Sequence, residues 1–197
     1  MWALAPSHVI VNIDENTREM VDAIAEFVPN IIVTHPLGPR DNLPLYRLVG
    51  GVFGREGDAE ALCRSFEAAY ARLAETAVAL PPRDVLYLIW KGPWMTVSRE
   101  TYVSRMLALV NWRTVGHDPA ARYPEVEITE ALLAGTDIVF FSSEPYAFAE
   151  ADIEEFRARY RVGDTTLAFI DGAMTSWYGA RAIPALDYLR ELAAELA

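Results

Sequence analysis

The chain has 197 residues, of which 52% are hydrophobic, and its formal net charge is −11. This length and composition allow one domain or two small ones with a real core. The negative charge opposes binding to nucleic acid, which requires a basic face. The acidic residues are dispersed, which is typical of solvated helix faces rather than of a metal-binding tail. The single cysteine, Cys63, excludes an intramolecular disulfide and a cysteine-based zinc site.

No apolar run reaches the roughly 18 residues of a membrane-spanning helix. The first residues, MWALAPSH, lack the basic region and the apolar region of a signal peptide. As written, the sequence therefore indicates a cytoplasmic protein. A natural start further upstream would instead allow a periplasmic or lipid-anchored protein.

The first part of the chain predicts strands that alternate with helices. Short β-rich runs indicate two buried strands, and apolar residues at helical spacing indicate the helices between and after them. In order, we expect a strand at His8–Asn12, a helix from Asn16 or Thr17 to Phe27, a strand at Asn30–Thr34, and a helix from Leu43 to Phe53. This order favours parallel strands with right-handed crossovers.

One long helix is predicted from Asp58 to about Leu80. Its apolar residues are spaced three or four apart, as one face of a helix requires: Leu62, Phe66, Ala69, Leu73 and Ala77. Asp58 is suited to cap its start, and Pro81 and Pro82 stop its end. We interpret this helix as a strut that joins two α/β lobes; an ordinary long helix within one domain is the alternative.

The rest of the chain repeats the alternation of strand and helix. We expect strands at Asp84–Trp90, Asp137–Ser142 and Thr165–Ile170, and helices at Arg99–Val110, Thr129–Ala134, Ala149–Tyr160 and Ala180–Leu196. The predicted fold class is α/β, with two small lobes of mainly parallel sheet flanked by helices. Residues 1–56 form the first lobe, residues 57–80 the linking helix, and residues 81–197 the second lobe.

In open α/β sheets, ligands bind beyond the carboxyl ends of the strands. The residues that follow the predicted strands are therefore the candidate ligand-binding residues: Asp14, Glu15, Trp90, Lys91, Trp94, Ser143, Glu144, Trp177 and Tyr178. Aromatic side chains with a few polar groups suit a large, flat, partly apolar ligand. The alternative for Trp90 and Trp177 is that they only plug the end of a sheet. Lys91 and Trp94 flank a Gly-Pro turn and are harder to explain as core.

Signals for catalysis are weak. The sequence has no G-x-S-x-G elbow, Walker loop or G-x-G-x-x-G motif, and its histidines (His8, His35 and His117) are not at metal-ligand spacing. Carboxylates such as Asp14 and Asp171 could act as acid or base, but capping the helices that follow them is the better explanation. We predict no enzyme, no catalytic residue, no bound metal ion and no resident cofactor.

Several segments resemble the helical-backbone substrate-binding proteins of ABC transporters, a class that includes the vitamin B12 binding protein and the siderophore receptors. HVIVNIDENTREMVDAI, NIIVTHP and LVGGVFGREGDAEAL resemble their first lobe, and VEITEALLAGTDIVFFSSEPYAF and IDGAMTSWYGARAIPALDYLREL resemble their second lobe. The sharpest matches are D-E-N-x-R after a strand and S-W-Y-G-x-R before the last helix. The resemblance implies two lobes bridged by a rigid helix, a ligand in the cleft between them, and a transporter permease as partner.

The chain departs from that family at its start. Members usually begin with a further strand-helix-strand section of the first lobe, ahead of the segment that matches HVIVN. We therefore expect the first lobe to be truncated and to leave an unpaired strand edge, because two strands alone are a marginal sheet. This predicts a homodimer through residues 1–34. The alternative is a monomer in which Trp2 and the long helix cover the edge.

The expected ligand is a small-molecule metal chelate, with a cobalamin-like corrinoid as the first guess. A bare ion is disfavoured because no His, Asp and Glu residues cluster at ligand spacing. A siderophore is less favoured because no arginine cluster is present for an anionic chelate. Trp90, Trp94, Trp177 and Tyr178 would stack on the ligand, and Asp14, Lys91, Ser143 and Glu144 would contact its polar rim. Two alternatives stay open: a cytoplasmic enzyme or chaperone acting on a related cofactor, and a degenerate lobe that only self-assembles.

Overall fold

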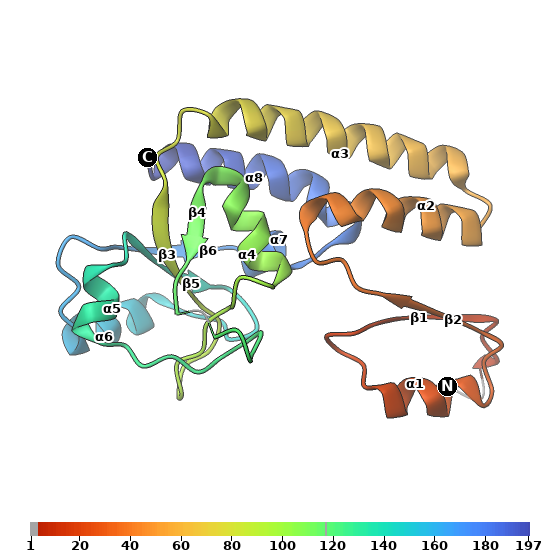
Figure 1. The fold of residues 1–197 in the computed structure, drawn as a ribbon, viewed down its shortest axis with the longest axis horizontal. Helices are drawn as coiled ribbons and strands as arrows, with labels where there is room; N and C mark the ends of the chain where they lie inside the picture. The colour runs from red at the N-terminus through yellow and green to blue at the C-terminus, as the bar shows by residue number, and fades with distance from the viewer. Residues whose placement is uncertain (1–3, 117) are drawn as a thin grey trace. The chain divides into compact units, whose positions relative to one another are not determined.

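The computed structural model describes residues 4–116 and 118–197 (Figure 1). Trp2 and His117, which enter the predictions above, lie outside these residues. The chain forms two compact units: a first unit up to Pro36 and a second unit, Leu37–Ala197. None of the helices in the described part of the chain is both long and apolar enough to cross a membrane.

The first unit contains two parallel strands and one helix. Strands β1 (His8–Asn12) and β2 (Asn30–Thr34) have the predicted bounds and pair in register from His8 opposite Asn30. Helix α1 (Arg18–Ala25) connects them and is capped by the Thr17 side chain, which accepts the Met20 N–H. Its amphipathic pattern buries no residue, so this unit has little core.

The second unit is built on a parallel sheet of four strands among the described residues. The strands are β3 (Arg83–Leu88), β4 (Trp112–Thr114), β5 (Ile138–Ser142) and β6 (Thr166–Ile170), in the order β4-β3-β5-β6. The chain runs from β3 outward to β4 and then returns to the other side of β3 to form β5. This reversal creates a topological switch point between β3 and β5, the usual place for a ligand in such sheets.

Helices cover both faces of this sheet, as the continuous apolar runs predict. The helices described in this unit are α2 (Asn42–Val52), α3 (Glu56–Ala77), α4 (Tyr102–Leu107), α5 (Glu130–Ala134), α6 (Glu150–Arg159), α7 (Gly172–Ser176) and α8 (Ala182–Glu195), with 3-10 turns at Pro39–Asp41, Ala108–Val110 and Gly179–Arg181. Alternate residues of a strand face opposite sides. Val85 and Tyr87 of β3 therefore join one buried cluster, while Leu86 and Leu88 join the other.

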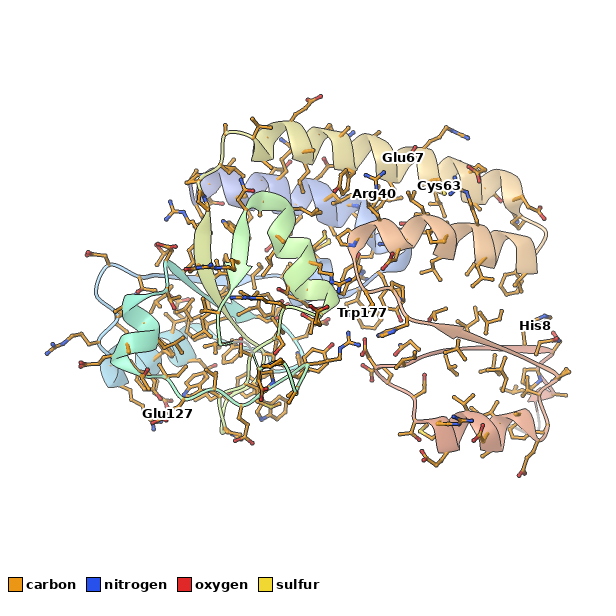
Figure 2. All side chains as sticks on the ribbon, viewed as in Figure 1. His8, Arg40, Cys63, Glu67, Glu127 and Trp177 are labelled. Atoms are coloured by element: carbon orange, nitrogen blue, oxygen red, sulfur yellow. The ribbon has the colours of Figure 1, made fainter. Side chains whose placement is uncertain are left out.

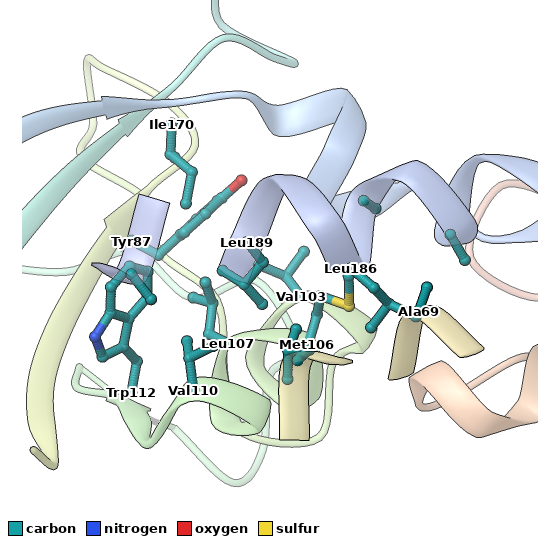
Figure 3. Close-up of a cluster of buried hydrophobic side chains, with 14 of the residues drawn as sticks. Ala69, Tyr87, Val103, Met106, Leu107, Val110, Trp112, Ile170, Leu186 and Leu189 are labelled. Carbon is teal, nitrogen blue, oxygen red and sulfur yellow. The ribbon is translucent and has the colours of Figure 1, made fainter. Parts of the chain in front are cut away.

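The larger cluster lies between the sheet and helices α3, α4 and α8. Figure 3 shows Met106 and Leu107 of α4 packed with Leu186 and Leu189 of α8 and with Tyr87 of the sheet. All five side chains are fully buried. The smaller cluster packs the opposite face of the sheet against α5 and α6. The predicted α/β class with parallel sheets flanked by helices is confirmed.

The long helix α3 carries the predicted apolar stripe. Phe66, Ala69 and Leu73 are buried, and the helix packs along α2 and α8, both of which belong to the second unit. Its start differs from the prediction, because Arg55 occupies the N-cap position and Asp58 lies in the first turn, paired with Arg55. The compact units divide after Pro36, whereas the predicted domain limits, after residues 56 and 80, stay a prediction.

Two short elements escape the sequence analysis. Strand β4 has three residues and helix α7 has five, too few to show a period. The helix expected from Arg99 begins later, at Tyr102, because the Thr101 side chain accepts the Ser104 N–H and caps it there. Leu48–Gly51 lies within α2, in agreement with the sequence pattern.

Candidate ligand-binding site

The segments that follow β3, β5 and β6 meet at one edge of the sheet. Beyond β5, the Ser143 N–H donates to the Ile170 carbonyl at the end of β6 (3.0 Å). Three residues later, the Tyr146 N–H donates to the Ile89 carbonyl beyond β3 (3.3 Å). The segment after β5 therefore bridges the other two, at the switch point between β3 and β5.

Gly172 allows the segments after β5 and β6 to approach closely. Its N–H donates to the Ser143 hydroxyl at 2.9 Å. A Cβ atom at this position would lie 2.4 Å from Ser142 Oγ and 2.6 Å from Glu144 Cγ, distances that real Cβ atoms do not show. A residue without a side chain is therefore required here.

A group of buried, hydrogen-bonded hydroxyls connects the strands and the helix that carry these segments. The Tyr87 hydroxyl lies 3.0 Å from Ser142 Oγ and 2.6 Å from Thr175 Oγ1, and all three residues are fully buried. Burial raises the pKa of Tyr87, so its phenol stays protonated. The Ser142 hydroxyl donates to the Glu144 carbonyl at 2.7 Å. This network links β3, β5 and α7 beneath the candidate site.

Trp177 presents an exposed aromatic face held at its edge. Its side chain is 57% exposed, and its indole N–H donates to the Glu144 carboxylate. The Arg181 guanidinium lies 6.0 Å from the centre of its ring, within cation–π range. Figure 2 labels Trp177 on the second unit. The structure therefore brings together two predicted residues, Glu144 and Trp177, and adds Arg181, which the predicted set lacks.

Trp90 is the second exposed aromatic side chain at this edge of the sheet. It is 40% exposed, and its ring packs edge-to-face on Tyr146 at 5.6 Å. Tyr146 also lies outside the predicted set, although it follows β5 by only four residues. Trp90 therefore packs on the end of the sheet and also exposes part of its ring to a ligand.

Tyr178 is a half-buried support rather than an open surface. Its ring meets Tyr102 of α4 edge-to-face at 6.0 Å. Burial raises the pKa of Tyr102 to about 12, so the phenol of Tyr102 stays protonated at ordinary pH. Of the two neighbouring aromatics, Trp177 is the one with a free face.

Lys91 is engaged within the protein. Its ammonium group donates to Asp152 and to Glu155 of α6, each at 2.7 Å. These carboxylates raise the pKa of Lys91 above its usual range, and Lys91 in turn lowers the pKa of Asp152. Its expected contact with a ligand rim stays a prediction, and it would have to compete with this ion pair.

Trp94, which the sequence makes hard to explain as core, is partly buried and packs against the smaller cluster. Its ring stacks on Phe148 (6.1 Å) and meets Phe156 of α6 edge-on (5.4 Å), and its indole N–H donates to the Tyr160 hydroxyl (3.0 Å). The Gly-Pro turn places the ring against α6, a contact between residues more than fifty positions apart that no local pattern shows. Lys91 and Trp94 also line an open hollow of about 790 Å³, together with Glu127 and Arg159.

Asp14 and Glu15 belong to the first unit, in the turn after β1. The Glu15 N–H donates to the Asn12 side chain at 2.8 Å. Thr17, not Asp14, caps α1, so the capping role expected of Asp14 is wrong. Asp171 does cap a helix, because its carboxylate accepts the Met174 N–H at the start of α7. No group of three or more His, Cys, Asp or Glu residues in the described part of the chain could hold a metal ion.

No protein-family model and no curated protein matches this sequence. Solved structures do match. The periplasmic vitamin B12 binding protein BtuF of Vibrio cholerae superposes with a TM-score of 0.83 at 14% identity, over 98% of this chain and 76% of that one. The chain has the fold of the helical-backbone, class III substrate-binding proteins.

Two haem-binding proteins share this fold with the chain. The periplasmic haem-binding protein RhuT from Roseiflexus gives a TM-score of 0.80 at 20% identity, over 98% of this chain and 78% of that one. The S. aureus protein IsdE, solved in complex with haem, gives a TM-score of 0.75 at 15% identity. The match covers 96% of this chain and 78% of that one. At these identities the likeness establishes the helical-backbone fold. The chain spans about three quarters of the length of each of these proteins.

Proposed function

We propose that this chain is the ligand-binding part of a solute-binding protein that delivers a metal chelate to the permease of an ABC transporter. The observation that carries the proposal is Trp177, an exposed indole whose edge is fixed by Glu144 and whose ring is flanked by Arg181. A fixed aromatic face loses little conformational entropy when a flat ligand stacks on it. The role is binding rather than catalysis, and it places the protein outside the cytoplasmic membrane.

A cobalamin-like corrinoid is the first ligand to test, and haem is the second. Structures with this fold include a vitamin B12 binding protein and haem-binding proteins. Both ligands are flat macrocycles wider than one indole ring. Trp90, the other exposed aromatic residue at the switch point, would supply a second apolar contact.

Optical titration tests this function directly. The purified chain is first examined for visible absorbance, which a bound corrinoid or haem would produce, and is then titrated with cyanocobalamin and with haemin. Saturable binding of one of them at micromolar concentration, with quenching of tryptophan emission that Trp177→Phe reduces, is the expected result. Failure of both chelates to bind would refute the proposed ligand class.

We also propose that the chain forms a homodimer through its first unit. Its sheet has two strands among the described residues, and Ile10 and Val33 remain 45% and 54% exposed. Ile10 and Val33 lie on opposite faces of this sheet, so pairing with a second copy would close one open strand edge with two-fold symmetry and cover one of the two faces at most. Light scattering after gel filtration should give twice the chain mass of 22.0 kDa. A monomer at high micromolar concentration would exclude the dimer.

A further inference from the structure

The loop that carries Trp177 and Tyr178 is held at a single residue, Gly179, by two side chains of α2. Gly179, the residue after Tyr178, has φ +83°, a conformation that favours glycine. Its N–H donates to the Asn42 side-chain oxygen at 2.6 Å, and its carbonyl accepts the Tyr46 hydroxyl at 2.8 Å. Both polar groups of this residue are thus bonded to α2, more than 130 positions away in the sequence.

Asn42 is bonded in further directions. Its amide group donates to the Pro39 carbonyl at 2.7 Å and to the Tyr102 hydroxyl at 3.0 Å. The side chain has no exposed surface. A buried amide that loses one partner incurs the desolvation cost of the group left behind, so this arrangement resists local change. Tyr102 in turn supports the ring of Tyr178.

Tyr46 holds the carbonyl side of Gly179. Its ring is buried and packs edge-to-face on Phe66 of α3 at 6.4 Å, so the phenol cannot swing away without opening the core. Burial raises the pKa of Tyr46 well above its usual range, so the hydroxyl remains a donor. Asn42 and Tyr46 lie four residues apart, on one face of α2.

We propose that Asn42 and Tyr46 are positioning residues of the ligand-binding loop: by clamping Gly179 they fix where the Trp177 ring and Arg181 stand. The ligand-binding part of this inference rests on the proposed function above. The geometric part does not. Asn42 and Tyr46 are both buried, so each acts on a ligand only through the loop. Loss of the clamp should release the loop without removing any ligand contact.

Fluorine NMR tests the clamp without a ligand. The protein is labelled with 5-fluorotryptophan, and the Trp177 line is assigned as the one missing from Trp177→Phe. Tyr46→Phe, which removes only a hydroxyl, and Asn42→Leu should shift or broaden the Trp177 line and leave the line of the buried Trp112 in place. Tyr160→Phe is the matched control, because its hydroxyl bonds to Trp94 and not to this loop. An unchanged Trp177 line in both clamp variants would overturn the proposal.

Ligand titration separates positioning from general stability. With cyanocobalamin or haemin, Tyr46→Phe should weaken binding about threefold and Asn42→Leu about tenfold or more, whereas Tyr160→Phe should change it less than about twofold. In a Trp177→Ala background, each clamp substitution should weaken binding less than it does in the wild-type background, because only Arg181 remains to be displaced. Full additivity of the two effects would show that the clamp does not act through Trp177, and would overturn the proposal. Should Asn42→Leu not fold, Tyr46→Phe carries the same test.

The two proposals can fail separately. If the wild-type chain binds neither chelate, the proposed function fails, while the fluorine spectrum still decides whether Asn42 and Tyr46 hold the loop. If the wild-type chain binds a chelate and the Trp177 line does not respond, the function stands and the clamp is refuted.

Discussion

Trp94 and Trp177 both follow a strand of the second unit, and each stands close to a basic residue and a glycine. Trp94 is partly buried and packs against Phe148 and Phe156 of the smaller cluster, whereas Trp177 is 57% exposed and has Arg181 over its ring. Both indole N–H groups are hydrogen-bonded, to Tyr160 and to Glu144 respectively. A hydrogen-bonded indole N–H therefore does not distinguish a structural tryptophan from a ligand-binding one. The difference is whether the face of the ring is packed against the protein or exposed.

The charged neighbours differ in the same way. Lys91, close to Trp94, is neutralised by Asp152 and Glu155 of α6. Arg181, close to Trp177, is exposed, and its guanidinium lies over the Trp177 ring. Lys91 is therefore engaged in ion pairs with α6, whereas the guanidinium of Arg181 is exposed and can contact a ligand.

The largest expected effect is on stability, for Trp94→Ala. Removing a ring packed against two phenylalanines should lower the free energy of unfolding by about 3 kcal/mol. Trp177→Ala, which removes a mostly exposed ring, should lower it by less than about 0.5 kcal/mol. Urea denaturation followed by circular dichroism measures both. Equal losses for the two variants would remove the contrast between the rings.

The reverse order is expected for ligand affinity. Trp177→Ala should weaken chelate binding by about 1–3 kcal/mol, the scale of one large aromatic contact. A Trp94 variant that still folds, such as Trp94→Phe, should bind within about a factor of two of wild type. Calorimetric titration with cyanocobalamin and haemin gives both values. Weaker binding by Trp94→Phe than by Trp177→Ala would assign the ligand to the other side of the sheet end.

A smaller effect is expected where the segments near Trp177 approach each other. Gly172→Ala places a Cβ against Ser142 and Glu144 and should destabilise the protein by about 1–3 kcal/mol. It should also change the emission of Trp177, because Glu144 holds that indole. Gly51→Ala is the matched control: apart from its chain neighbours and the backbone of α2, no atom lies within 4 Å of the added Cβ, so it should stabilise the protein by about 0.5–1 kcal/mol. A neutral Gly172→Ala variant would show that the segments can separate.

The smallest effect concerns the ion pair near Trp94. The hydrogen bond from Lys91 lowers the pKa of Asp152 in the folded state. Its contribution to stability is therefore present above the ordinary Asp value of about 3.9 and is lost as the pH falls through the lower folded value. The difference in unfolding free energy between wild type and Asp152→Asn should be no more than about 1 kcal/mol near neutral pH and should shrink towards about pH 2. A difference that stays constant with pH would contradict this assignment.

Much of the fold could be predicted because its elements carry local patterns. The strands β1 and β2 have the predicted bounds, and the apolar stripe of α3 identifies its buried face. Element ends are less certain, since they depend on which side chain takes the cap. Thr101 starts α4 and Arg55 precedes α3, whereas the sequence favoured Arg99 and Asp58.

The sequence by itself determined the alternation of strands and helices, and it directed attention to the carboxyl ends of the strands, where Glu144 and Trp177 do meet. Only the tertiary structure decided that Lys91 and Trp94 face α6 and that Asn42 reaches Gly179. The physical reason is the range of the interactions. Hydrophobic period and helix capping act within a few residues, so the sequence displays them. The exposure of a side chain depends on residues that are brought beside it from fifty or more positions away.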